Sequence, residues 1–348
     1  MTIDYAFRGY QVRRIAVSGF GRIGRNFLRA ALKRKNFGED FEIVAVNDIA
    51  DIKTLAYLLK YDSVQGRLGK KIILDENRMR IDGHEIEFYM IKDPRNLPWK
   101  RLEVDFVLEA TGLFRDKKKA SMHLEAGASR VVISAPSPDP DVTLVLGVNE
   151  DKYDPDKHFI ISNASCTTNS LAPPLRVLHE NFKVESGLMT TVHAYTGGQR
   201  IVDFPHAKDV RRGRAAAVSI VPTSSGAANA ISQVIPDLAG KMTGMALRVP
   251  TPVGSVTDLT VRLQKDVTVN DVNSVLREAA NGSLKGIMEY TEDPIVSVDV
   301  IGNPHSAIID ALSTLVVPEP GKMVKVFSWY DNEFGYANRL VDLMGKIL

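Results

Sequence analysis

The sequence has a single cysteine, Cys166, in the stretch SNASCTTNS. The apolar residues before it predict a strand and the residues after it predict a helix, so the thiol is expected at a strand-to-helix junction. At a helix start, the positive end of the helix dipole lowers the pKa of a cysteine and favours the nucleophilic thiolate. A buried, inert thiol is the alternative, and for a lone cysteine it is the commoner outcome. The neighbouring Ser, Thr and Asn residues make an apolar filler less convincing here.

A histidine follows on a predicted strand, His193 in TTVHAYTGGQ, 27 residues after Cys166. A histidine next to a cysteine acts as the base that generates and stabilises the thiolate. His193 is flanked by Val192 and Ala194, so taken alone it is as consistent with a structural role as with catalysis. Contact between the two side chains depends on the tertiary fold.

Three glycines, Gly19, Gly21 and Gly24, form the pattern G-x-G-x-x-G between a predicted strand and a predicted helix. Glycines in this context permit a tight turn and let the backbone approach a pyrophosphate, which the helix N-terminus binds; a turn that merely needs glycines is the alternative. A second predicted strand ends at Asp48, whose carboxylate is suited to accept hydrogen bonds from ribose hydroxyls. The same carboxylate would repel a 2′-phosphate. The pattern therefore favours NAD, with NADP as the less favoured cofactor.

Arginines, hydroxyls and glycine N–H groups recur in the second half of the chain, in RRGRAA, PTSSGAAN and MALRVP. These are the groups with which proteins bind phosphate. For Arg211 and Arg214, a solvated basic loop is an equally good interpretation. Arg248 lies in an otherwise apolar predicted strand, where a buried guanidinium needs a partner, so an anion is more attractive there.

The composition is typical of a soluble globular protein, with 44% hydrophobic and 25% charged residues and a formal net charge of +2. The small net charge argues against nucleic acid as the primary partner, and the run RDKKK is interpreted as a solvated helix face. No stretch approaches the roughly 18 uninterrupted apolar residues of a membrane span. The first residues lack the pattern of a secretory signal, so we expect a cytoplasmic protein.

Metal chemistry is not expected from the sequence. One cysteine excludes an internal disulfide and a cysteine-rich metal site. The histidines other than His193 show no metal-ligand spacing and are interpreted as structural or surface residues: His84, His123, His158, His179, His206 and His305.

At 348 residues the chain is long enough for two domains. Strand-like and helical runs alternate up to about residue 165, which indicates a parallel sheet with crossover helices, and residues 70–90 suggest an antiparallel insertion. Beyond that point, long β-branched runs predict a mostly antiparallel sheet covered by helices. We therefore predict an α/β fold: a doubly wound Rossmann-type dinucleotide-binding domain over residues 1–165, followed by an α+β catalytic domain.

Nine motifs stand in a fixed order along the chain: GFGRIGR, VND, EATGLF, ISAP, SNASCTTN, TTVHAYT, IVPTSSGAA, GKMTGMALRVPT and WYDNEFGYANR. With them the chain resembles the phosphorylating glyceraldehyde-3-phosphate dehydrogenases from about Arg13 to the C-terminus, and only the first dozen residues look like an extension. The resemblance implies a homotetramer. It also implies that a C-terminal helix over residues 332–348 packs back on the cofactor domain, which leaves 166–331 as the catalytic domain.

The resemblance further implies roles for individual residues. Cys166 matches the nucleophile, and His193 matches its base, which also donates to the oxygen of the hemithioacetal. The positions that hold the substrate phosphate and the inorganic phosphate are matched by Ser165, Thr167, Thr196, Arg212, Ser225, Gly226 and Arg248. The positions that contact NAD are matched by Gly19, Gly21, Arg22, Ile23, Gly24, Asp48, Thr111, Gly112, Ser134 and Asn332.

The implied reaction is the oxidation of D-glyceraldehyde 3-phosphate to 1,3-bisphosphoglycerate, with NAD and inorganic phosphate, in glycolysis or gluconeogenesis. The Cys166 thiolate adds to the aldehyde, hydride leaves to NAD, and inorganic phosphate attacks the resulting thioester. Such a site must keep water from attacking the thioester.

The chain departs from the family pattern at several positions. Ser170 stands where relatives often have a second cysteine, which removes the partner for a local disulfide. Gly197 and Gly198 replace a common Asn-Asp pair, and Ser225 replaces a threonine but keeps the hydroxyl. Pro205 fits the pattern of NAD-preferring members.

Two other functions stay open at this point. Erythrose-4-phosphate dehydrogenases share the fold and the Cys–His chemistry but have little need for inorganic phosphate. A non-catalytic relative that binds nucleotides or RNA is a different class, disfavoured by the near-neutral charge and by the absence of a basic stripe interleaved with aromatic residues. A papain-like hydrolase also uses Cys and His, but the 27-residue spacing and the glycine pattern do not fit it.

Overall fold

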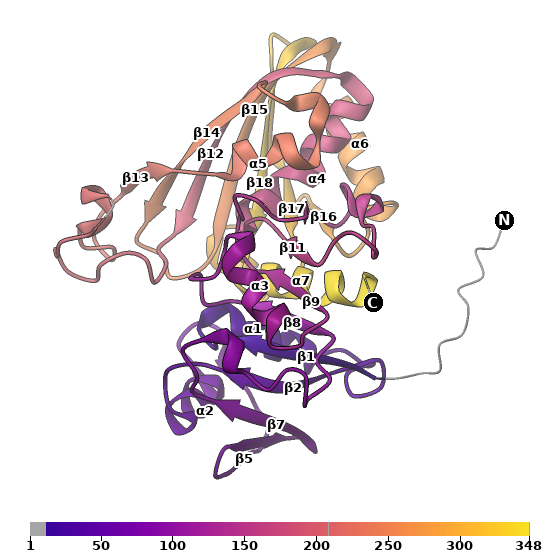
Figure 1. Ribbon diagram of the computed structural model, residues 1–348. Helices are drawn as coiled ribbons and strands as arrows, with labels where there is room; N and C mark the ends of the chain where they lie inside the picture. The colour runs from indigo at the N-terminus through magenta and orange to yellow at the C-terminus, as the bar shows by residue number, and fades with distance from the viewer. Residues whose placement is uncertain (1–11, 208, 348) are drawn as a thin grey trace. The chain divides into compact units, whose positions relative to one another are not determined.

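The computed structural model of the chain describes residues 12–207 and 209–347 (Figure 1). The predicted N-terminal extension therefore lies, but for its last residue, outside the described residues. The described chain divides into two compact units. Unit 1 contains the residues up to Asp141, together with Asp154–Ser162 and the chain from Val341 on. Unit 2 contains Val142–Tyr153 and Asn163–Leu340.

Unit 1 is built on a parallel sheet with strand order β11-β9-β8-β1-β2-β7-β6-β5. The strand β1 lies between β8 and β2 and is parallel to both, while β5, β6 and β7 form antiparallel pairs at one edge. This confirms the predicted Rossmann-type domain and its antiparallel insertion. The strands are β1 (Arg13–Ser18), β2 (Phe41–Asn47), β5 (Ile72–Asp75), β6 (Arg78–Ile81), β7 (His84–Tyr89), β8 (Phe106–Glu109), β9 (Arg130–Ile133) and β11 (Ile160–Ser162), beside a small hairpin of β3 (Tyr61–Asp62) and β4 (Gly66–Arg67).

Helices connect the parallel strands and cover the sheet. They are α1 (Arg22–Ala31), α2 (Ile52–Lys60) and α3 (Lys117–Glu125). The parallel strands are buried almost throughout, which is why they read as continuous apolar runs rather than as an alternation. Because β1 has β8 on one side and β2 on the other, the loops after these strands meet at the switch point where doubly wound sheets bind ligands.

Unit 2 is built on a mixed sheet with strand order β13-β14-β12-β15-β18-β17-β16. Four of its pairings are antiparallel, and β12·β14 and β16·β17 are parallel, in agreement with the predicted mostly antiparallel sheet. The strands are β12 (Val184–Ala194), β13 (Val221–Ser224), β14 (Met242–Val249), β15 (Ser255–Val267), β16 (Met288–Thr291), β17 (Ala307–Val317) and β18 (Gly321–Tyr330).

Three helices of unit 2 lie together on one face of this sheet: α4 (Cys166–Phe182), α5 (Ala227–Val234) and α6 (Val269–Asn281) (Figure 1). Their apolar side chains and those of the inner sheet face form one large core. The last helix is α7 (Phe334–Lys346). The remaining short elements are β10 (Val142–Thr143) and the 3-10 turns η1 (Pro94–Asn96), η2 (Glu150–Lys152), η3 (Val210–Gly213), η4 (Pro236–Leu238) and η5 (Ser297–Val300).

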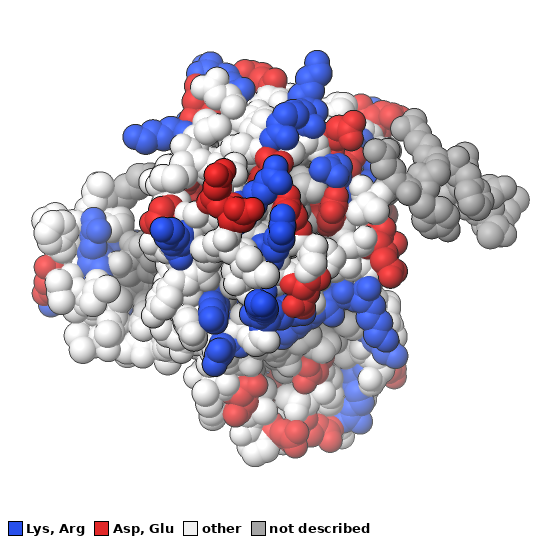
Figure 2. All heavy atoms as spheres, turned by 90° about the horizontal axis from the view of Figure 1, so that it is seen from below, with Lys and Arg blue, Asp and Glu red and all other residues white. Residues whose placement is uncertain are grey.

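Charges of both signs are interspersed on the face of the molecule seen in Figure 2. Charged side chains of unit 1 pair locally, as in Arg78–Glu85 and Arg101–Glu87. None of the helices within the described ranges is long and apolar enough to cross a membrane.

Candidate active site

Cys166 is the first residue of α4, directly after the capping residue Ser165. The Ser165 hydroxyl accepts a hydrogen bond from the backbone N–H of Thr168 at 3.0 Å, which fixes the helix start. The residue before the cap, Ala164, adopts a left-handed φ of +53°, and its carbonyl oxygen accepts from the Tyr336 hydroxyl at 2.8 Å. A strained backbone held by its surroundings is common at functional sites. The predicted strand-to-helix junction is thus found, with the thiol at the helix start.

The thiol lies against the predicted histidine. Cys166 Sγ is 3.4 Å from His193 Nε2, which is hydrogen-bonding distance for sulfur. His193 lies near the end of β12 on the inner face of the sheet, where the strand alternation buries it. The contact that the sequence left undetermined is therefore present.

Arg248 is the neighbour of His193 on the adjacent strand. The parallel register of β12 and β14 places these two residues side by side. Arg248 Nη1 is 2.5 Å from His193 Nδ1 and donates to the Ala194 carbonyl oxygen at 3.1 Å. A guanidinium has no acceptor, so Nδ1 accepts from Arg248 in this arrangement, and the ring hydrogen lies on Nε2, facing the sulfur.

A second arrangement of the histidine is available at the same place. His193 Nδ1 is also 2.7 Å from the Ala194 carbonyl oxygen. If Arg248 turns to an anion, Nδ1 can carry the hydrogen and donate it to this carbonyl, which leaves the Nε2 lone pair free to take the thiol proton. The guanidinium therefore controls whether Nε2, the nitrogen that faces Cys166, is a donor or an acceptor.

Burial and charge act in opposite directions on the thiol. Burial raises the pKa of Cys166, and the nearby Arg248 charge, together with hydrogen bonds from Thr167, opposes that rise. Burial and the Arg248 charge lower the pKa of His193 to about 3, so the ring is neutral at neutral pH. Arg248 is thus the group that favours a thiolate without first protonating the histidine.

We expect Arg248→Met to raise the pKa of Cys166 further, because the substitution removes an opposite charge next to the thiolate. The measurement is the rate of Cys166 alkylation by iodoacetamide as a function of pH. Arg211→Met is the matched control, since Arg211 is an exposed arginine on η3. An unchanged midpoint in the Arg248 variant would contradict this account.

A buried tyrosine supports the pair and was not predicted from the sequence. The Tyr330 hydroxyl lies 3.0 Å from Thr167 Oγ1 and 2.8 Å from Thr191 Oγ1. Its ring packs edge-on against the His193 ring, with centroids 6.0 Å apart. Burial raises the pKa of Tyr330, so its hydroxyl stays protonated. The signal that could have found it is its position in WYDNE, where a strand ends in polar residues.

Arg212 is a second arginine whose charge acts on Arg248. Its guanidinium donates to Thr223 Oγ1 at 2.9 Å and lies 3.5 Å from Asp209. Thr223 is on β13, which pairs with β14. Burial, and to a smaller extent the Arg212 charge, lower the pKa of Arg248. Two guanidinium groups close enough to repel each other form a site that an anion would stabilise.

The other predicted phosphate ligands lie on loops and at a helix start in unit 2, without a hydrogen bond to the Cys166–His193 pair. Thr196 is exposed after β12, and its N–H faces Gln199 Oε1 at 3.3 Å. Gly226 caps α5, and the Ser225 hydroxyl accepts from the Ala227 N–H at 3.3 Å. The start of α5 presents N–H groups of the kind that bind anions.

The glycine pattern in unit 1 forms a tight turn after β1. Gly19 has a φ of +93°, and a Cβ there would lie 2.6 Å from the backbone nitrogen of Thr111. A Cβ on Gly24 would lie 2.2 Å from the Gly19 carbonyl oxygen, so this glycine permits α1 to approach the turn. The helix α1 begins at Arg22, and its first N–H groups have no partner within the helix.

A cavity of about 440 Å³ opens at this turn. It is lined by residues that follow β1, β2 and β8, including Gly19, Asp48 and Thr111. Asp48 accepts the Phe20 N–H at 2.7 Å and the Ala50 N–H at 3.0 Å, which holds its carboxylate at the cavity wall. The three strand ends thus bring together residues that the sequence associated with a dinucleotide.

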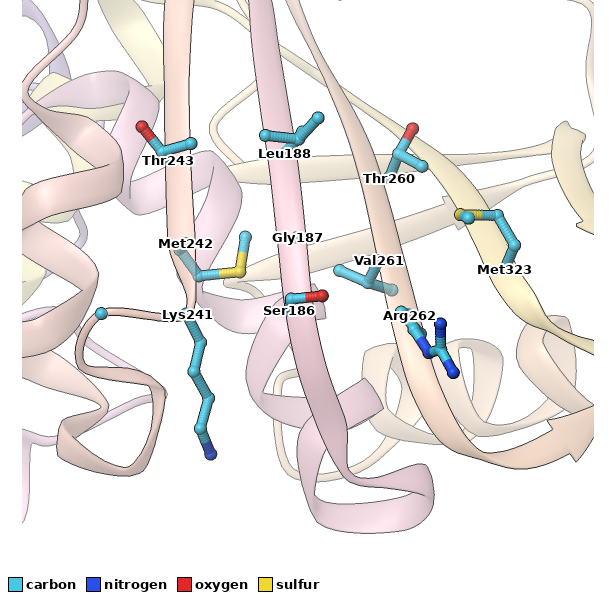
Figure 3. Close-up of a pocket in the computed structure, with 11 residues that line it drawn as sticks. Ser186, Gly187, Leu188, Lys241, Met242, Thr243, Thr260, Val261, Arg262 and Met323 are labelled. Atoms are coloured by element: carbon cyan, nitrogen blue, oxygen red, sulfur yellow. The ribbon is translucent and has the colours of Figure 1, made fainter.

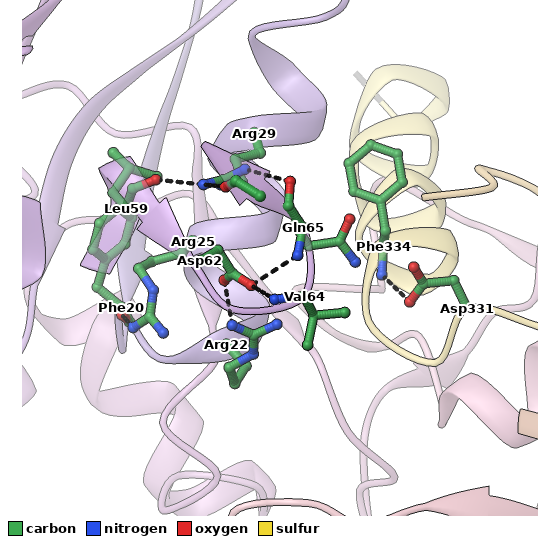
Figure 4. A network of polar contacts seen from close by, with 11 residues as sticks. Phe20, Arg22, Arg25, Arg29, Leu59, Asp62, Val64, Gln65, Asp331 and Phe334 are labelled. Carbon is green, nitrogen blue, oxygen red and sulfur yellow. Dashed lines mark hydrogen bonds and ion pairs between the residues drawn. The ribbon is translucent and has the colours of Figure 1, made fainter. Parts of the chain in front are cut away.

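The side chain of Arg22 is fixed by an ion pair within unit 1. Its guanidinium pairs with Asp62, which also accepts the N–H groups of Val64 and Gln65 at 2.9 Å (Figure 4). Ile23 follows on α1.

Two further predicted cofactor contacts form hydrogen bonds of their own. Ser134 donates its hydroxyl to the Glu109 carbonyl oxygen at 3.0 Å. In unit 2, Asn332 Oδ1 accepts from Ser255 Oγ at 3.0 Å.

Another cavity, of about 370 Å³, lies on the sheet of unit 2 (Figure 3). Leu188, Met323 and neighbouring residues of β12, β14, β15 and β18 line it. It contains none of the predicted site residues. Among the described residues, no group of three or more His, Cys, Asp or Glu side chains is placed to hold a metal ion.

Two family models match the chain. The model of the NAD binding domain of glyceraldehyde 3-phosphate dehydrogenase matches residues 13–117, and the model of the C-terminal domain matches residues 165–332. The chain is 56% identical to glyceraldehyde-3-phosphate dehydrogenase of Geobacillus stearothermophilus over 334 residues, which is 96% of this chain and 98% of the relative. It is 55% identical to the enzyme of the same name from Thermotoga maritima over 335 residues, 96% of this chain and 99% of the relative.

Proposed function

The chain belongs to the glyceraldehyde-3-phosphate dehydrogenase family, and we propose that it oxidises D-glyceraldehyde 3-phosphate with NAD and inorganic phosphate to 1,3-bisphosphoglycerate. It is an NAD-dependent oxidoreductase by this membership. The observation that carries the proposed chemistry is the 3.4 Å contact between Cys166 Sγ and His193 Nε2 at the start of α4. Arg248 beside this pair supplies the positive charge that a thiolate and a phosphorylated substrate require.

We propose that Cys166 is the nucleophile and His193 the proton carrier. His193 Nε2 takes the thiol proton as sulfur adds to the aldehyde carbon, and it then donates to the oxyanion of the hemithioacetal. As hydride leaves the carbon, Nε2 takes the hydroxyl proton, and a Cys166 thioester remains. An oxygen of inorganic phosphate attacks the thioester, the thiolate leaves, and an acyl phosphate is released.

The residues of unit 1 fit NAD. A Cβ on Gly21 would have no protein atom within 4 Å, and Gly21 lines the 440 Å³ cavity, so the backbone there is open to the pyrophosphate, beside the N–H groups that open α1. Asp48 lies at the wall of the same cavity as an acceptor for the ribose hydroxyls. The remaining proposed contacts are Gly21, Arg22, Ile23, Thr111, Gly112, Ser134 and Asn332. NAD supplies the acceptor for the hydride.

We propose that two groups of side chains hold the two phosphates. In the first group, Arg248 contacts His193, Thr167 contacts Tyr330, and Arg212 contacts Thr223 on the strand that pairs with that of Arg248. The loop and helix-start groups, Ser165, Thr196, Ser225 and Gly226, complete the proposed set. Because Arg212 and Arg248 repel each other, binding of an anion relieves that repulsion.

We expect Asp48→Gly to raise the KM for NAD about tenfold and to lower the discrimination against NADP by a similar factor, because it removes an acceptor and a charge that repels a 2′-phosphate. The measurement is kcat/KM with each cofactor.

Asp48→Asn is the matched control for this prediction. Its amide oxygen can still accept the Phe20 N–H, although the Ala50 N–H loses its acceptor, so most of the loop's contacts are kept while the charge is lost. The control should therefore relax the discrimination against NADP while weakening NAD less. An unchanged cofactor preference in both variants would remove Asp48 from the ribose site.

The test of the proposed function is a steady-state assay with D-glyceraldehyde 3-phosphate and with erythrose 4-phosphate, each with and without inorganic phosphate. We expect phosphate-dependent turnover with glyceraldehyde 3-phosphate preferred. Turnover that prefers erythrose 4-phosphate and does not need phosphate would overturn the proposal. The names of the relatives favour the first outcome.

We also propose a homotetramer that works in the cytoplasm. Exposed apolar side chains gather on the outer face of the unit 2 sheet, among them Leu188, Leu315 and Met323. They lie on β12, β17 and β18, with β15 between β12 and β18, and Figure 3 shows Leu188 and Met323 of this group. An apolar patch of this kind is typical of an interface. Sedimentation equilibrium measures the mass, and a monomer would contradict the proposal.

The division of labour along the chain is a further part of the proposal. We propose that residues 1–165, joined by 332–348, bind the cofactor and that 166–331 perform the catalysis. The family models support it, since the NAD binding model matches residues 13–117 and the C-terminal model matches 165–332.

A further inference from the structure

A fully buried chain of hydrogen bonds runs through unit 1, outside the catalytic pair. The side chains of Trp99 and His123 are 0% exposed, and Glu109 is 1% exposed. Trp99 Nε1 lies 3.1 Å from His123 Nδ1, and His123 Nε2 lies 3.2 Å from Glu109 Oε2. Burying a carboxylate costs free energy unless hydrogen-bond donors surround it. A buried glutamate of this kind is therefore a candidate for a role in function.

The direction of each hydrogen bond follows from the chemistry of the groups. An indole N–H can only donate, so His123 Nδ1 accepts and the ring hydrogen lies on Nε2. The neutral ring therefore donates from Nε2 to Glu109 Oε2. The other carboxylate oxygen, Oε1, accepts the backbone N–H of Thr111 at 2.8 Å and the Thr111 hydroxyl. Glu109 thus accepts at both oxygens.

The chain of hydrogen bonds ends at the wall of the cofactor cavity. Thr111 Oγ1 accepts the Leu113 N–H at 3.0 Å, which closes a turn whose central Gly112 has a φ of +72°. The backbone of this turn packs against Gly19, where a Cβ would lie 2.6 Å from Thr111 N. Thr111 and Leu113 line the 440 Å³ cavity together with Gly19.

The opposite side of the same strand end is also tied to Glu109. Its carbonyl oxygen accepts both the N–H and the hydroxyl of Ser134, each at 3.0 Å. Phe114, which also lines the cavity, packs edge-on against the His123 ring with centroids 6.0 Å apart. Glu109 therefore connects a buried aromatic pair with the turn that faces the cofactor.

We propose that Glu109 is a positioning residue for NAD, oriented by His123 and, through His123, by Trp99. The carboxylate fixes the turn 110–113 against the glycine turn after β1, so that the cavity has its binding shape before the cofactor arrives. Glu109 does not line the cavity itself. The inference rests on the proposed function in one respect, namely that this cavity holds NAD.

Glu109→Gln tests the direction of the hydrogen bonds at constant shape. An amide offers one oxygen and one NH₂ group, so it cannot accept from both His123 and Thr111. One donor then faces another donor, and we expect the Kd for NAD, measured by titration calorimetry, to rise about tenfold. The turnover number at saturating NAD and the alkylation rate of Cys166 should change less than about twofold, because a pre-organisation defect acts on binding.

The double variant Glu109→Gln, Trp99→Phe is the decisive measurement. Without the indole donor, His123 can carry its hydrogen on Nδ1 and accept the amide N–H of the glutamine at Nε2, so that no donor faces another donor, although the phenylalanine offers Nδ1–H no acceptor. We expect the Kd for NAD to return to within about threefold of the wild-type value, although Trp99→Phe on its own weakens binding slightly. A merely structural role for Trp99 predicts the reverse, because two buried substitutions then add to the damage.

The outcomes separate this inference from the proposed function. If the wild-type protein does not bind NAD, the proposed function fails. If it binds NAD and Glu109→Gln binds equally well, or the double variant binds no better than Glu109→Gln, the inference alone is overturned. Should far-UV circular dichroism show that Glu109→Gln does not fold, His123→Gln and His123→Leu give the same comparison. The glutamine can donate to Glu109 and accept from Trp99, so only the leucine should raise the Kd, by about fivefold.

Discussion

Cys166→Ser is expected to lower the turnover number by a factor on the order of 10⁴ and to leave the Kd for NAD within about twofold of the wild-type value. A serine hydroxyl has a far higher pKa than a thiol, and a neutral histidine at hydrogen-bonding distance does not ionise it in the ground state. The cofactor cavity is lined by residues of unit 1, whereas Cys166 belongs to unit 2, so cofactor binding should persist. Steady-state rates and titration calorimetry measure the two quantities.

The single cysteine makes the control for this variant simple. Iodoacetamide should inactivate the wild-type protein at one equivalent per chain and should not label Cys166→Ser at all, because no other thiol is present. Ser170→Ala is the matched substitution, since it removes a hydroxyl from the same helix without touching the sulfur, and it should keep most of the turnover. Substantial turnover in Cys166→Ser would mean that another residue is the nucleophile.

Local patterns predicted the parts of the site that one strand end or one helix start creates. The glycine turn, Asp48 after β2 and the thiol at the start of α4 each depend on neighbours in the sequence, and each lies where it was expected. The contact between Cys166 and His193 depends instead on how α4 packs against the sheet. Likewise, the parallel register of β12 and β14 brings Arg248 to His193, and no local pattern specifies that register.

Residues that act through other residues left little trace in the sequence. Tyr330 contacts Thr167 and Thr191, which are far from it along the chain. His123 was interpreted only as a structural or surface histidine, and its contact with Glu109, the last residue of β8, depends on where α3 packs in the fold. Buried polar groups of this kind depend on partners from several elements, which periodicity and motif spacing do not reveal.

The serine at position 170 illustrates how packing explains a departure from the family pattern. Its hydroxyl lies 2.8 Å from Ser328 Oγ, and both residues are fully buried between α4 and β18. The two buried hydroxyls form a hydrogen bond with each other, and a thiol, which is a weak donor and a weak acceptor, would form a weaker one. Ser170 therefore contributes a hydrogen bond that joins α4 to the sheet.

His193→Asn is expected to lower the turnover number by about 10²- to 10⁴-fold, the range typical for loss of a general acid–base group. Asparagine can still contact Arg248 and the Ala194 carbonyl oxygen near the position of Nδ1, but it leaves nothing at the position of Nε2, 3.4 Å from the sulfur. The thiolate then loses a hydrogen-bond donor, which raises the pKa of Cys166 further above its ordinary value.

The pH dependence distinguishes the two roles of this histidine. Below the pKa of the thiol, the thiolate fraction grows about tenfold for each pH unit in both proteins, so the deficit of His193→Asn should shrink only above the wild-type midpoint, where the wild-type thiolate is already saturated. Iodoacetamide alkylation reports thiolate formation alone, without hydride transfer. His193→Gln places an amide N–H close to where Nε2 lies but cannot carry a proton. We therefore expect its alkylation midpoint nearer the wild-type value, with turnover still low. If turnover recovers along with alkylation in that variant, His193 serves only to stabilise the thiolate, and the proton from the hemithioacetal must leave by another route.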